Sequence, residues 1–176
     1  MRTLFLALCF AALSAVAAGP ATPAFPEAAA EFQRALGGDK EAVDRAVAAF
    51  DALARADAAQ PLYEAYLGAA QTLRARDAWM PWNKVKYAEE GLDHIDRALK
   101  RLNPENGRQL LRGVPAGLET RLTAANTFLK LPDGIFHRRA QGKSLVAALA
   151  ADPALPGTPD GFRKALAQAV HEAATP

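Results

Sequence analysis

The sequence predicts an all-α protein, and three observations lead to that prediction. Alanine and leucine dominate the chain of 176 residues, whereas the β-branched residues that favour strands are sparse. Apolar residues recur three and four positions apart in most segments, which is the spacing of one face of a helix. No stretch alternates apolar and polar residues over the length of a strand. Because 51% of the residues are hydrophobic, one core can form, and we expect one domain of about eight helices.

Residues 1–18 have the composition of a secretory signal peptide. Arg2 supplies a positive charge, residues 4–16 form an uncharged apolar run, and small residues follow it. The run is too short to span a bilayer, so we expect it to be cleaved; retention as an anchor is the alternative. We therefore predict a periplasmic or secreted protein whose mature chain does not span the membrane. Residues 19–26, which are small and rich in proline, are expected to form an extended leader.

Three helices are expected after the leader. The first begins at Glu27 and stops at a pair of glycines. Asp39 can cap the second helix, because its side chain can accept a hydrogen bond from a free backbone N–H of the first turn. Pro61 stands where a third helix can begin, since proline lacks the N–H that a first turn leaves unbonded. Residues 74–83 break the helical spacing and are expected to form an insertion before the next helix.

The fourth helix has the clearest pattern. Asp96 and Lys100 lie four residues apart on its polar side, where opposite charges can pair. Asn103 and Pro104 end it. Its apolar residues alternate steps of four and three and therefore share one face: Val85, Ala88, Leu92, Ile95, Leu99 and Leu102.

Four further helices are expected in the rest of the chain. A short one covers residues 105–113, and a longer one covers residues 117–131. The next covers residues 140–151. The last is capped by Thr158, has Pro159 at its first position and buries the stripe Phe162, Leu166, Ala169 and Val170.

The middle of the chain carries the spacing of a known helical repeat. A tetratricopeptide unit is a pair of helices. Along its sequence an aromatic-x2-Leu-Gly-x2-Tyr element is followed by Ala-x3-Phe and then by Pro. Here one copy has Leu67-Gly68, then Gly91 with Ile95, then Ala98-Leu99 and Pro104. A looser copy upstream has Leu36-Gly37, Ala46, Phe50 and Pro61, and another downstream has Gly113, Ala124, Phe128 and Pro132. Residues 27–132 therefore resemble the tetratricopeptide-repeat superfamily.

The resemblance implies antiparallel helix pairs stacked as a short right-handed solenoid, whose concave face binds a peptide. Residues 133–176 would then form C-terminal capping helices. The middle unit departs from the consensus by its insertion of about ten residues and by Glu64 in the aromatic position. The alternative is a generic helical bundle that matches these short motifs by chance.

Composition argues against several classes of protein. The net charge is only +2, and no basic stripe indicates nucleic acid as a partner. One cysteine and three histidines exclude a disulfide framework or a metal site built from several cysteines. No nucleophile elbow, phosphate loop or dinucleotide motif is present, so we expect no catalysis, no cofactor and no bound metal. The sequence favours a non-catalytic scaffold or adaptor that binds a protein or peptide partner in the cell envelope.

The insertion is the first candidate binding surface. It holds both tryptophans of the chain, Trp79 and Trp82, with Arg76 and Lys84 nearby. Tryptophan beside charge is common in binding hot spots. A groove near the two tryptophans could instead serve a small molecule or an envelope component. The structural alternative is that both rings fold back as core plugs over the adjoining helices.

The second candidate is a basic cluster where the repeats end. It consists of His137, Arg138 and Arg139. A cluster of this kind can bind an acidic partner, or it can simply be a solvated charged segment.

Overall fold

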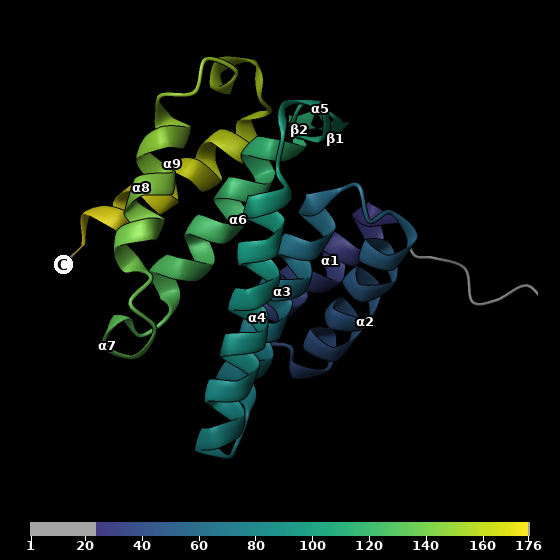
Figure 1. Cartoon of the computed structure of the whole chain (residues 1–176), viewed down its shortest axis with the longest axis vertical. Helices are drawn as coiled ribbons and strands as arrows, with labels where there is room; N and C mark the ends of the chain where they lie inside the picture. The colour runs from purple at the N-terminus through teal and green to yellow at the C-terminus, as the bar shows by residue number, and fades with distance from the viewer. Residues whose placement is uncertain (1–23, 176) are drawn as a thin grey trace, which may run out of the picture.

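The computed structural model describes residues 24–175, and it confirms the all-α class (Figure 1). Seven long helices and two of four residues make up most of this part of the chain. One two-stranded hairpin and one 3-10 turn, η1, interrupt them. In chain order the elements are α1 Phe25–Leu36, α2 Lys40–Ala56, α3 Pro61–Asp77, α4 Pro81–Arg101, α5 Pro104–Gly107, β1 Leu110–Leu111, β2 Val114–Pro115, α6 Ala116–Lys130, α7 Asp133–Phe136, α8 Arg139–Ala150, η1 Leu155–Gly157 and α9 Asp160–Ala174.

The first helix begins earlier than the sequence predicts. The expected signal peptide and residues 19–23 of the expected leader lie outside the described residues. Phe25 and Pro26, however, belong to α1 and not to a leader. Phe25 is buried against the rings of Phe50 and Tyr66, with centroids 6.2 and 5.6 Å away. Pro26 fits the first turn of a helix, so this tertiary contact and the helix start reinforce each other.

Four of the seven long helices form a row, and the other three pack against that row. Helices α1, α3, α6 and α9 form a row in which each contacts the next. Helix α2 packs on α1 and α3, α4 packs on α3 and α6, and α8 packs on α6 and α9. The row of four is therefore backed by three helices, as the ribbon shows for α3, α4 and α6 (Figure 1).

Four clusters of buried side chains hold this arrangement together, the smallest of them formed by Ala35, Ala42 and Val43. The N-terminal cluster is aromatic, and Phe50 stacks on Tyr66 with centroids 4.7 Å apart. The C-terminal cluster is mainly aliphatic, with Phe162 among its members, and joins α6, α8 and α9. A third cluster, formed by Leu92, Ile95, Ala124 and Phe128, joins α4 to α6. It therefore links the two halves of the protein.

Helices α3 and α4 approach closely at a pair of glycines. A Cβ atom on Gly68 would lie 2.4 Å from the carbonyl oxygen of Gly91, and one on Gly91 would lie 2.6 Å from that of Gly68. Only glycine leaves room for two helix backbones at this distance. Glu64 reinforces the contact by accepting hydrogen bonds from Arg97 and Arg101 at 2.8 and 2.7 Å.

The expected insertion at residues 74–83 is helical and is not a loop. Helix α3 continues to Asp77 and α4 starts at Pro81, so only residues 78–80 form the turn. Arg74 and Arg76 still contact α2 and α1, but the turn beyond them extends past the other helices (Figure 1). A helix end with no neighbour to pack against needs no apolar stripe.

The prediction of a helix over residues 105–113 is also wrong. Only α5 is helical, and Leu110–Leu111 pairs with Val114–Pro115 in an antiparallel hairpin. Its turn places Arg112 and Gly113 in the left-handed region, at φ 54° and 78°. Tertiary packing explains the hairpin, because Leu111 packs on the N-terminal cluster and Val114 belongs to the C-terminal one.

The last helix departs from the prediction in two details. Thr158 does not cap α9; its hydroxyl donates to the Leu155 carbonyl in the preceding turn. Pro159 precedes the first helical residue, Asp160. Phe162, Leu166 and Ala169 are buried as expected, whereas Val170 is exposed.

Candidate functional site

A groove of about 1030 Å³ lies along the row of four helices. Helices α1 and α3 and the first turns of α4 contribute residues on one side. Helix α6 contributes residues along most of its length, and α7, α9 and the β1–β2 hairpin contribute the rest. Neither α2 nor α8, which back the row, contributes a lining residue. The groove therefore lies between the N-terminal and C-terminal halves, where segments distant in sequence meet.

The groove leaves apolar surface open to solvent. Phe32, Leu122 and Phe162 are buried side chains that form part of its wall. Eight large apolar side chains are exposed within residues 24–175, and three of them, Leu36, Val85 and Ile135, line this groove. Apolar surface collected in one concavity is typical of a binding site, whereas single exposed residues are ordinary.

A buried carboxylate lies in the groove wall. Glu119 is 6% exposed, and its Oε1 accepts a hydrogen bond from the Tyr66 hydroxyl at 2.6 Å. Arg112 donates to the same oxygen from Nη2. Glu119 Oε2 is buried and has no hydrogen-bond partner within the described part of the chain. Because removing a carboxylate from water is costly, the Arg112 guanidinium is needed to hold this charge in place.

The surroundings of this carboxylate shift the pKa values of its two partners. Burial raises the pKa of Tyr66 above its ordinary range, and the Glu119 charge raises it further. Burial alone would lower the pKa of Arg112, but the attraction of Glu119 outweighs it and the pKa is raised. The Arg112 guanidinium also lies over the Phe25 ring, 4.6 Å from its centroid. Tyr66 therefore stays a donor and Arg112 a cation.

The charged residues that line the groove are mostly basic. Arg76 and Lys84 come from the ends of α3 and α4 that form the hairpin, and Lys130 comes from the end of α6. Arg76 is bound by Asp77 at 2.8 Å and donates to the Ala35 carbonyl at 3.1 Å. Hydrogen bonding to Arg76 lowers the pKa of Asp77. Lys130 has no carboxylate partner among the described residues.

The sequence-predicted site residues fall into two groups. Arg76 and Lys84 line the groove, whereas Trp79 and Trp82 do not. Trp79 is 89% exposed and Trp82 is 66% exposed, at the turn of the α3–α4 hairpin. The alternative in which both rings act as core plugs is therefore wrong. Lys84 and Val85 bring a groove close to the tryptophans in sequence, but neither ring lines it.

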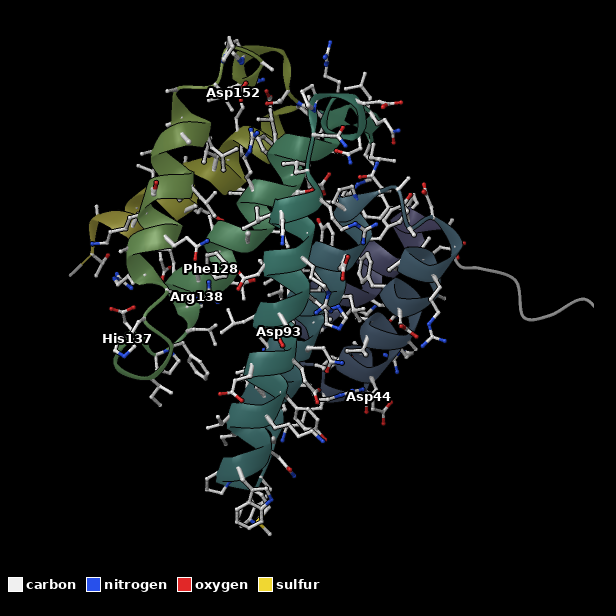
Figure 2. All side chains as sticks on the ribbon, in the orientation of Figure 1. Asp44, Asp93, Phe128, His137, Arg138 and Asp152 are labelled. Atoms are coloured by element: carbon white, nitrogen blue, oxygen red, sulfur yellow. The ribbon has the colours of Figure 1, made fainter. Side chains whose placement is uncertain are left out.

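The basic cluster at residues 137–139 is used inside the protein. Arg138 binds Asp96 through two hydrogen bonds of 3.0 and 2.5 Å and lies 5.3 Å from the centroid of the Phe128 ring (Figure 2). Asp96 therefore pairs with Arg138 and not with Lys100. Arg139 donates to backbone carbonyls of α6 and of the end of α9. Only His137 points outward, so the three residues do not form a free basic surface.

Sequence reasoning missed Tyr66, Arg112, Glu119 and Lys130 as site residues. Glu119 was the signal in the sequence that could have led to this site. Helix α6 buries residues on most of its faces, and a carboxylate among buried residues requires partners. The partners could not be identified in advance, since Tyr66 is 53 residues away.

Comparison with protein-family models, curated proteins and solved structures finds no match to this chain. Within residues 24–175, no helix is long and apolar enough to cross a bilayer. The same residues contain no group of three or more His, Cys, Asp or Glu side chains that could hold a metal ion.

Proposed function

We propose that this chain is a non-catalytic binding protein whose groove holds an anionic amphiphile, a molecule with an apolar chain and an acidic head group. The observation that carries this proposal is the groove of about 1030 Å³ in which Leu36, Val85 and Ile135 stay exposed. Its volume is at the upper end of the range for small-ligand sites, roughly 300–1,000 Å³. An apolar chain in the groove would remove these side chains from water.

The charges of the groove support an acidic head group. Glu119 is the one acidic side chain among the described lining residues, and Arg112 already balances it. Arg76, Lys84 and Lys130 leave an excess of positive charge, and Arg76 alone of these three is paired with a carboxylate. Lys84 reaches only a backbone carbonyl, at 3.4 Å. Charge-assisted hydrogen bonds from Lys84 and Lys130 would therefore favour an anion over a neutral head group.

A second candidate is the scaffold that binds a protein or peptide partner. The alternation of α1, α3, α6 and α9 with the helices behind them supports it, because a tetratricopeptide-like solenoid lines its binding face with one helix of each pair. A peptide would occupy the same groove. Location in the cell envelope, which rests on residues 1–18, remains a prediction from the sequence.

Binding of dansyl-labelled undecanoic acid tests the proposal. We expect the acid to bind the wild-type protein, and Val85→Trp to weaken binding about tenfold, because the indole would fill part of the groove that the chain needs. Lys130→Gln should weaken binding of the acid but not of an uncharged dansyl amide of matched length. Fluorescence titration measures both.

Leu110→Ala is the matched control, because Leu110 is exposed and lies outside the groove. This variant should bind the acid as the wild type does. Equal affinity of wild type and Val85→Trp would contradict the proposal. If the acid does not bind but a peptide is captured by a photo-crosslinker placed at position 85, the scaffold is the better account.

A further inference from the structure

The end of the α3–α4 hairpin presents a compact apolar surface, which we call the hairpin tip. It consists of Trp79, Met80 and Trp82, all of them exposed. Together with the groove, the tip accounts for six of the eight large apolar side chains exposed in residues 24–175. Exposed apolar surface is therefore concentrated at two places and is not scattered over the protein. A concentration of this kind indicates contact with something else.

The two helices present the tip as a rigid projection. The backbone N–H of Ala78 donates to the Arg74 carbonyl at 3.0 Å and ends α3, and that of Lys84 donates to the Met80 carbonyl at 3.1 Å and starts α4. The close approach of Gly68 and Gly91 locks the two helices together. Figure 1 shows both helices running past the rest of the protein at this end. Little ordering of the backbone is needed before the tip can bind.

Basic side chains follow the tip within two helical turns. Lys84 and Lys86 are both exposed. Asp77, the acidic residue closest in sequence, is bound by Arg76, and Glu90 lies 3.9 Å from Lys86. Residues 76–86 thus contain three basic residues and one acidic residue. Positive charge beside exposed indoles is the composition that binds the interface of an anionic membrane.

We propose that the hairpin tip docks on the surface of an anionic lipid membrane. The two indoles and Met80 would enter the interfacial region, and Lys84 and Lys86 would stay at the level of the head groups. Tryptophan favours this region because its ring is apolar while its N–H can bond to water or to head groups. Each basic residue adds attraction to the negative surface potential.

The shape of the tip favours a membrane over a protein partner. A stable protein interface buries about 800 Å² on each side and surrounds its central aromatic residues with a rim that excludes water. Two helix ends and the turn between them offer no such rim. A bilayer interface accepts a narrow projection without a matching surface. Both proposals use Lys84, but the variants that test docking leave it unchanged, so the two proposals can fail separately.

Tryptophan fluorescence can test this directly, because the chain has two tryptophans and both are at the tip. On addition of phosphatidylcholine vesicles containing phosphatidylglycerol, we expect a blue shift of the emission and quenching by brominated lipid. Vesicles of phosphatidylcholine alone should give a much weaker response, and added salt should reduce the response to anionic vesicles. The emission reports on the tip and not on residues 1–23.

Co-sedimentation of variants with the anionic vesicles gives the second readout. The double variant Trp79→Ala/Trp82→Ala should bind at least about tenfold more weakly, and Lys86→Gln about fivefold more weakly. Leu110→Ala and Lys164→Gln change exposed residues elsewhere and should bind as the wild type does. All variants keep the same residues 1–23, so differences between them come from the substitutions.

Thermal unfolding should be unchanged in the tip variants, since the replaced side chains are exposed. An unshifted tryptophan emission with anionic vesicles would overturn the proposal. Vesicle binding that is the same in the double tryptophan variant would overturn it as well. So would capture of a protein partner that depends on both tryptophans when no vesicle binding is seen.

Discussion

Replacing Phe128 by alanine is expected to lower the free energy of unfolding by about 3–5 kcal/mol. Phe128 is fully buried in the cluster that joins α4 to α6, where it packs with Leu92 and Ile95. The substitution leaves a cavity between the two halves and removes the ring beneath the Arg138 guanidinium. Urea denaturation followed by circular dichroism measures the change.

Ile135→Ala is the matched control for Phe128→Ala, because it removes a large apolar side chain that is exposed. It should change the stability by no more than about 0.5 kcal/mol. If Phe128→Ala lowered the free energy of unfolding as little as this control, the cluster between α4 and α6 would not be what couples the two halves.

Gly68→Ala is expected to destabilise the protein by roughly 1–3 kcal/mol, although alanine is the better helix former. The added methyl would lie 2.4 Å from the Gly91 carbonyl oxygen and 2.8 Å from Cγ1 of Ile95. The first of these is backbone and cannot rotate away, so α3 and α4 must separate. The same denaturation experiment tests this.

Gly161→Ala makes the same change in α9, where nothing lies within 4 Å of the added methyl. It should be neutral or stabilise the protein by up to about 1 kcal/mol. Equal effects of the two substitutions would show that the close approach of α3 and α4 is not a constraint.

The long helices could be predicted from the sequence because local signals and tertiary packing agree. Asp39 caps α2 by accepting from the Ala42 N–H at 3.0 Å, and Pro61 opens α3, both as expected. The stripe of α4 is buried at Ala88, Leu92 and Ile95. Such signals lie within a few residues of one another, so the sequence displays them directly.

The errors arose where distant contacts decide the structure. Leu110 and Leu111 fit a helix as well as a strand, and the left-handed conformation of Arg112 has no sequence signal. Asp96 has Lys100 one helical turn away, yet it pairs with Arg138, which the fold brings to it from 42 residues away. A local charge pattern cannot reveal a partner of that kind.

The candidate site was predicted only in part, because contacts between residues distant in sequence also form the site. Arg76 and Lys84 were found because they flank the conspicuous tryptophans. Glu119 and Tyr66 come from different helices and meet only when α3 packs on α6. The groove itself is lined by residues from six helices and the β1–β2 hairpin, and no single segment of the sequence contains it.

Methyl NMR spectroscopy in solution tests the central claim, that the groove holds an anionic amphiphile, most directly. The protein would be titrated with undecanoic acid. We predict saturable shifts of the methyl signals of Leu36, Val85 and Ile135, which line the groove, and unchanged signals of Leu110 and Val170, which are exposed elsewhere. Equal shifts in both sets, or no shifts in the groove, would contradict the account.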